Sequence, residues 1–387
     1  MCMMPAAAFA QDGLVRRHRA LLDSIDSNNT TLRALRQQVA AGEAEARVGL
    51  RLPDPELGLA YLWGSPSGVP PRKNVEVTQQ LDWGVLSGRR RQLARSVGAQ
   101  LRGDYRAQRR EVMAEAERVL TDLTYYNRLC GELARRKADA DEVSRLYEKR
   151  RERGDANRMD VNKMRLNASM AAAELRRAET GRTRLRLDLQ RLNGGKAVRW
   201  DDTVYVDHAL PALADLRTAL PAAPALAAAE AAVEQGRARL RLSRAEALPA
   251  LTVGYAGEYL KGDGHSGVSV GLSLPLWGGT RRRTAQSRAE LVLAELRRDD
   301  LKARAAAELE QRYAEALGLR TTADRLAGEL AEADNGALLR RALETGRLSL
   351  LEYLLELSFC YDARTQWMEA ERDARRAEAE VWLLTLE

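Results

Sequence analysis

Four short stretches of the chain alternate apolar and polar positions with the period of two that is typical of β-strands. They lie at residues 57–63, 75–83, 251–259 and 268–276. In each, one face is apolar and the other is polar or small, and in the first three, aromatic residues lie toward the ends of the apolar face. The pattern predicts four strands, and it fits a membrane barrel wall and a half-buried soluble sheet equally well.

Most of the remaining sequence is charged and carries apolar residues at spacings of three and four. One such segment runs without proline from Ser87 to Gly154, and a second returns from about Asn157 to Leu192. Two more are predicted at residues 280–345 and from 349 to the C-terminus, with a turn at Gly346. Narrow apolar seams on such long helices predict coiled-coil packing rather than burial in a globule.

The strands and helices form one unit that occurs twice, with an offset of about 194 residues. In both copies a helix ends near a Leu-Pro pair, two strands follow, and a basic turn opens a long helix. The basic turns read LSGRRRQLARS at 86–96 and WGGTRRRTAQS at 277–287. We therefore divide the chain into a first repeat (11–193), a linker (194–223) and a second repeat (224–387). Residues 1–10 are interpreted as the remnant of a signal peptide, because Ala8-Phe9-Ala10 fits the cleavage pattern.

The number of strands favours a membrane barrel shared between chains. Four strands cannot close a barrel, and the helices offer no second layer to cover an apolar sheet face. That face must meet lipid or copies of itself. Three chains with four strands each would give a barrel of twelve strands.

Composition argues against several other classes of protein. The net charge is +7, but acidic and basic residues are interspersed, whereas a nucleic-acid surface needs the basic residues gathered together. The histidines and cysteines are isolated in sequence, so no metal site, cofactor or enzymatic activity is predicted. They are His18, His208, His265, Cys2, Cys130 and Cys360.

The whole chain resembles the TolC family of outer-membrane efflux channels, and most of all its CzcC/CusC-type members. The duplicated strand–strand–hairpin unit, the LPDPELGLAYLWG segment and two hairpin tips carry the resemblance. The tips read RGDANRMDV and TGRLSLLEYL. In this family the tip is a Gly, five residues, and then an acid followed by an apolar residue. Gly154 to Asp160-Val161 and Gly346 to Glu352-Tyr353 match that pattern.

The resemblance implies a mainly α protein with a small β part. Three copies would form a twelve-stranded barrel in the outer membrane and an α-helical tunnel through the periplasm. The tips would dock on a periplasmic adaptor (membrane fusion protein) attached to an inner-membrane pump of the RND type. Small molecules or metal ions would leave the cell through this duct. The linker would lie in a belt around the tunnel, and the basic turns would lie near outer-membrane lipid phosphates.

The resemblance also suggests particular site residues. Rings of like charge can gate a pore, so Asp155, Asp160 and Glu352 are candidate gate acids, with Arg158 and Arg347 as their ion-pair partners. The three acids fit the role of solvated tip residues or helix caps equally well. The candidate docking residues are Gly154, Ala156, Gly346 and Leu348. The membrane-interface residues are expected to be Trp63, Trp83, Tyr255, Tyr259 and Trp277. The main rival is a soluble coiled-coil scaffold, which leaves the four apolar strand faces unexplained.

Overall fold

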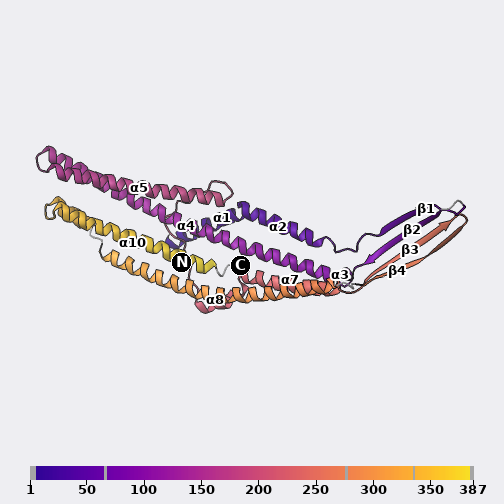
Figure 1. The fold of residues 1–387 in the computed structure, drawn as a ribbon. Coiled ribbons are helices and arrows are strands. Elements are labelled where there is room, and N and C mark those ends of the chain that lie inside the picture. The colour runs from indigo at the N-terminus through magenta and orange to yellow at the C-terminus, as the bar shows by residue number, and fades with distance from the viewer. Residues whose placement is uncertain (1–5, 65–67, 275–277, 334–335, 384–387) are drawn as a thin grey trace, which may run out of the picture. The chain divides into compact units, whose positions relative to one another are not determined.

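The computed structural model describes residues 6–64, 68–274, 278–333 and 336–383 (Figure 1). The strands are β1 (Glu56–Leu62), β2 (Arg72–Leu81), β3 (Ala250–Leu260) and β4 (Asp263–Ser273). The helices are α1 (Ala6–Asn28), α2 (Thr30–Arg47), α3 (Trp83–Leu86), α4 (Arg89–Glu152), α5 (Arg158–Leu192), α6 (Leu213–Ala219), α7 (Pro224–Ala245), α8 (Gly279–Glu332), α9 (Gly336–Glu344) and α10 (Leu350–Leu383). Among the described residues, no helix combines the length and apolar character needed to cross a membrane.

Contacts divide the chain into two compact units, and each takes segments from both sequence repeats. The first, here the hairpin unit, comprises Met1–Arg33, Gln108–Leu220 and Ala305–Glu387. The second, the sheet unit, comprises Ala34–Ala107 and Pro221–Arg304. The division into two repeats and a linker is a division of the sequence, and the packing follows a different one.

The sheet unit contains one antiparallel sheet in the order β1-β2-β3-β4, which confirms the four predicted strands. Its register aligns like residues across the sheet. Leu57, Val77, Tyr255 and Val268 form one row on one face. The adjacent row on the other face holds Gly58, Glu76, Ala256 and Gly267. Because neighbouring residues of a strand point to opposite faces, one face of the sheet is apolar and the other is polar or small.

The two sequence copies meet within the sheet unit. β2 of the first copy pairs with β3 of the second along nine residue pairs, from Lys73↔Tyr259 to Leu81↔Leu251. Just beyond β2, the indole N–H of Trp83 donates to the carbonyl of Pro249 at 2.7 Å. Backbone hydrogen bonds between β2 and β3 therefore join the two sequence copies into one sheet, in addition to side-chain contacts.

The hairpin unit buries apolar side chains where its helices and the linker pack together. One cluster combines Tyr125 and Leu133 of α4 with Met368 of α10 and Tyr205 of the linker. The linker is also anchored by Trp200, whose indole N–H donates to Thr124 Oγ1 at 2.9 Å. Most of this linker has no regular secondary structure, yet its aromatic residues lie in the core.

One sequence prediction of a continuous helix was wrong. The segment predicted at residues 280–345 is two helices, because α8 ends at Glu332 and α9 begins at Gly336. The described residue Ala333 lies outside both helices. Because this segment contains no proline, its sequence carried no signal that the helix ends there. The other three long helices end within a few residues of their predicted bounds.

Candidate functional site

The first hairpin tip joins α4 to α5 through a turn that requires glycine. Gly154 has a φ of +84°, in the left-handed region that residues with a Cβ avoid. The Gly154 amide donates to the Arg151 carbonyl at 3.0 Å, and the Asp155 amide donates to the Arg150 carbonyl at 2.8 Å. These two bonds define a Schellman motif, which satisfies the last carbonyls of α4.

The second tip repeats the same motif between α9 and α10. Gly346 has a φ of +70°. Its amide donates to the Leu343 carbonyl at 3.2 Å, and the Arg347 amide donates to the Ala342 carbonyl at 2.9 Å. The prediction that both glycines form tight turns is confirmed.

The helices that leave the tips are capped in two different ways. The Asn157 side chain accepts from the Asp160 amide at 2.9 Å at the start of α5. At the start of α10, Ser349 and Glu352 form a reciprocal capping box. The Ser349 amide donates to the Glu352 carboxylate at 2.8 Å, and the Glu352 amide donates to Ser349 Oγ at 3.3 Å. Hydrogen bonds to the Glu352 carboxylate from the Ser349 side chain and backbone lower the pKa of Glu352 below its usual value. The geometry thus assigns Glu352 a capping contact.

The two tips pack against each other within the hairpin unit. Tyr147, Val161 and Met164 of the first hairpin form a buried cluster against which Leu350 and Leu354 of α10 pack. Burial in this cluster raises the pKa of the Tyr147 phenol. The two turns, which resemble each other in sequence, therefore lie in one structural region.

An ionic contact adds a second link between the hairpins. Arg340 of α9 binds Asp139 of α4 and also lies 3.8 Å from Glu142. The hydrogen bond to Asp139 opposes the burial of the guanidinium and leaves the pKa of Arg340 raised overall. No local sequence pattern predicts this pair, because Arg340 and Asp139 are 201 residues apart along the chain.

The structure places the other predicted tip residues at the surface. Asp155, Arg158 and Arg347 are exposed, whereas Ala156, Asp160 and Leu348 are half-buried. Among the described residues of this single chain, Arg158 and Arg347 make no ion pair with the three candidate acids. The gate and docking roles of these residues therefore stay predictions.

The predicted membrane-interface aromatics lie at or next to the sheet. Trp63 is 83% exposed and packs edge-on against Tyr61. The hydroxyls of Tyr255 and Tyr259, both on the apolar face, lie 3.3 Å apart. Trp83 is the least exposed of the four because of its contact with Pro249. Trp277 lies outside the described residues.

The basic turns begin at equivalent glycines, Gly88 and Gly278, which share a φ of +70°. The arginines of the first turn are partly engaged within the sheet unit. Arg90 binds Asp82 at 2.7 Å and Glu246 at 2.9 Å, and Arg89 donates to the Arg241 carbonyl. Arg91 and the three arginines of the second turn are exposed, so they remain free to face a membrane surface.

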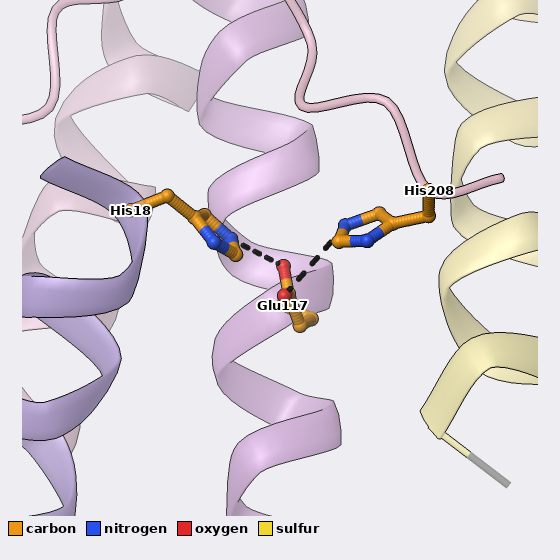
Figure 2. A group of neighbouring side chains, drawn as sticks. All are labelled: His18, Glu117 and His208. Atoms are coloured by element: carbon orange, nitrogen blue, oxygen red, sulfur yellow. Dashed lines mark hydrogen bonds and ion pairs between the residues drawn. The ribbon is translucent and has the colours of Figure 1, made fainter. Parts of the chain in front are cut away.

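Two of the three histidines, although isolated in sequence, come together in the fold. His18 of α1 and His208 of the linker both approach Glu117 of α4 inside the hairpin unit (Figure 2). His18 Nε2 lies 2.8 Å from one carboxylate oxygen of Glu117, and His208 Nε2 lies 3.8 Å from the other. Burial lowers the pKa of His208. No local sequence pattern links these residues, so only the folded chain brings them together.

The fold is similar to that of several solved outer membrane proteins. The chain is similar to the VceC outer membrane protein of Vibrio cholerae (TM-score 0.77, 15% identity, 96% of each chain covered). It is also similar to the CmeC outer membrane channel of Campylobacter jejuni (TM-score 0.76, 15% identity, 95% of this chain and 86% of that one). The MtrE outer membrane channel of Neisseria gonorrhoeae gives a TM-score of 0.76 at 17% identity, with 95% and 88% covered. At these identities the likeness establishes the fold alone.

Sequence comparison finds one family model that matches part of the chain. Residues 216–385, which include nearly all of the second repeat, match the family model described as outer membrane efflux protein. None of the curated protein sequences matches the chain. This family match covers less than half of the chain.

Proposed function

We propose that the chain is the outer-membrane exit duct of a tripartite efflux pump. Three copies form the channel, which passes small molecules or metal ions from an inner-membrane transporter and a periplasmic adaptor to the exterior. The observation that carries this proposal is the four-stranded sheet, which is apolar on one face and polar or small on the other. A soluble coiled-coil scaffold is not favoured, because it gives no reason for that face.

The exposure of the apolar face supports a lipid contact. Val268 is 83% exposed although it lies at the end of an apolar row. The other exposed apolar residues on this face include Leu57, Leu59, Val270 and Leu272. Lipid is the environment in which such a face is stable.

The edges of the sheet support assembly. β1 pairs only with β2, and β4 pairs only with β3, among the described strands. Unpaired strand edges are costly in a membrane, where no water replaces the missing hydrogen bonds. Pairing of β1 in one chain with β4 in the next removes both edges, and twelve strands from three chains close the barrel.

The tips are the proposed docking surface for the adaptor, and the pump behind it is proposed to be of the RND type. Both tips belong to one packed region of the hairpin unit, so a single adaptor hairpin can contact Gly154, Ala156, Gly346 and Leu348 together. A bulky side chain introduced at the tips should block docking of the adaptor. Ala156→Trp should abolish adaptor pull-down from purified membranes, whereas Ala172→Trp, at a half-buried position on α5, serves as the control for a bulky helix substitution.

The acids of the tips are proposed to form the pore gate. In a closed trimer, Asp155 and Asp160 of one chain would pair with Arg158 or Arg347 of a neighbour. Asp160→Asn should then raise single-channel conductance in planar bilayers, because the closed state loses an ion pair. Asp324→Asn, an exposed acid on α8, should leave conductance unchanged. Equal conductance in both variants would remove Asp160 from the gate.

The proposed function is tested by the mass and solubility of the protein. The chain, expressed with a full signal sequence, should appear in the outer-membrane fraction and require detergent for extraction. Light scattering should then give three times the chain mass of 43.0 kDa after correction for detergent. A species that is soluble without detergent would reject the channel.

A further inference from the structure

Three segments of the hairpin unit converge on a single buried carboxylate. His18 comes from α1, Glu117 from α4 and His208 from the linker. One ligand-type atom from each residue lies within 4.8 Å of the others. Figure 2 shows the two imidazole rings on opposite sides of Glu117, each directed toward its carboxylate.

The carboxylate of Glu117 is incompletely satisfied. The residue is 2% exposed, and Oε1 is buried without a hydrogen-bond partner. His18 contacts Oε2 at 2.8 Å, while His208 Nε2 stays 3.8 Å from Oε1, beyond hydrogen-bond distance. An unpaired oxygen on a buried carboxylate is strongly unfavourable. The arrangement therefore calls for a further electrophilic partner between Glu117 and His208.

We propose that His18, Glu117 and His208 bind a divalent transition-metal cation, for which Zn²⁺ is the best match. Two imidazoles and one carboxylate form a ligand set that suits Zn²⁺, with a fourth position left for water. Tetrahedral Zn²⁺ with bonds of about 2.0–2.1 Å separates its ligand atoms by roughly 3.4 Å. The observed separations of 2.8 and 3.8 Å lie on either side of that value.

The surroundings of the cluster are compatible with a cation. Arg375, whose positive charge acts on His208, is held by Asp207 at 2.7 Å and by Glu378 at 3.0 Å, so its charge is largely balanced. Trp200 packs edge-on against the His18 ring, and the Trp382 ring lies 4.5 Å from that of His208. These aromatic walls limit access of water and hold both imidazoles in place.

A cation in this position would cross-link three segments of the hairpin unit. It would tie the first helix and the linker to α4, across 99 residues of sequence between His18 and Glu117. Metal binding is coupled to folding when the ligands come from distant segments. The site is thus a structural one that holds the linker in place, and it is independent of what the channel transports.

The test is direct binding of Zn²⁺ to the full-length detergent-solubilised protein after treatment with a chelator. Equilibrium dialysis should give one Zn²⁺ per chain, and Co²⁺ should give the intense visible absorption of a four-coordinate site. His208→Gln and Glu117→Gln should each weaken Zn²⁺ binding at least tenfold and abolish the Co²⁺ spectrum. His265→Gln is the matched control, because His265 lies on β4 in the sheet unit.

The outcomes separate the proposal from adventitious binding. Zn²⁺ should also raise the Tm of the wild type and of His265→Gln, but leave that of His208→Gln unchanged. Circular dichroism serves as the check that each variant folds. His208 is the decisive position, because it lies in the linker rather than in a helix. Stoichiometric binding that survives His208→Gln, or no binding to the wild type at micromolar Zn²⁺, would overturn the proposal.

Discussion

Gly154 and Gly346 hold the same position in two copies of one turn. Each has a positive φ, and in each turn the next amide donates to a carbonyl five residues earlier, at 2.8 Å in the first tip and 2.9 Å in the second. A duplicated chain has thus kept the same helix termination twice, although the residues around the two glycines differ. The turn geometry, rather than the side chains beside it, is what both tips share.

Substitution of either glycine should destabilise its tip through the backbone alone. A Cβ at Gly154 or Gly346 meets no atom within 4 Å, so the left-handed conformation is the sole penalty. Gly346→Ala should therefore lower the free energy of unfolding by about 1–2 kcal/mol. Gly131→Ala is the matched control: it also meets open space but lies inside α4, where alanine favours the helix by about 1 kcal/mol. Chemical denaturation should give opposite signs, and a stabilising effect of Gly346→Ala would contradict the turn geometry.

The capping box predicts a local pH dependence at the second tip. Because hydrogen bonds from Ser349 lower the pKa of Glu352, its stabilising effect is present above the usual value of 4.5 and is lost as the pH falls through the lowered pKa. Hydrogen exchange at the first turn of α10 should therefore speed up on acidification. Ser349→Ala should weaken protection at every pH, by about 1 kcal/mol.

The control for this prediction is Glu352→Gln. Glutamine keeps a side chain that can complete a capping box, but it does not titrate. The variant should retain protection and lose its pH dependence in this range. An unchanged pH dependence would show that another group controls the tip.

The sheet faces predict opposite effects for two adjacent positions. Val268 lies on the apolar face, and Ser269 lies on the polar one, paired with Gly254. Val268→Arg should cost up to about 2–4 kcal/mol in the membrane and sharply reduce the amount of trimer in the outer membrane. Ser269→Arg should be tolerated. Immunoblots of outer-membrane fractions measure both, and equal loss in the two variants would argue against a lipid-facing side.

Loss of the Arg340 contact should loosen the tips more than it destabilises the protein. Arg340 and Asp139 are each about two-fifths exposed, and such pairs contribute at most about 1 kcal/mol. Arg340→Ala should nevertheless raise channel conductance, because α9 leads directly into the second tip. Arg325→Ala is the control, since Arg325 pairs with Glu329 along its own helix. Conductance equal to that of the wild type would limit Arg340 to a structural role.

Much of the fold could be predicted from local patterns. Alternation revealed the four strands, because each has one apolar face, and Gly154 and Gly346 marked the turns where long helices end. The Ser349-x-x-Glu352 capping box was also readable, since its spacing is a known signature. The break after Glu332 was overlooked because the segment contains no proline.

Other features depend on contacts between distant segments. His18 and His208 carry no local signal, and only the packing of α1 and the linker on α4 brings them to Glu117. The contact of Arg340 with Asp139 is likewise a product of helix packing. Sequence periodicity reports which face of an element is buried, but it does not report the residue that will lie opposite.

In the proposed trimer, β1 of one chain pairs with β4 of the next, and disulfide trapping can detect this pairing. In a background with Cys2, Cys130 and Cys360 replaced by serine, cysteines are placed pairwise at Gly58 or Ala60 of β1 and at Gly267 or Ser269 of β4. These residues share the polar face. At least one pair should give a covalent trimer in oxidised outer membranes, while the single-cysteine chains should not. Only monomers from all four pairs would contradict the shared barrel.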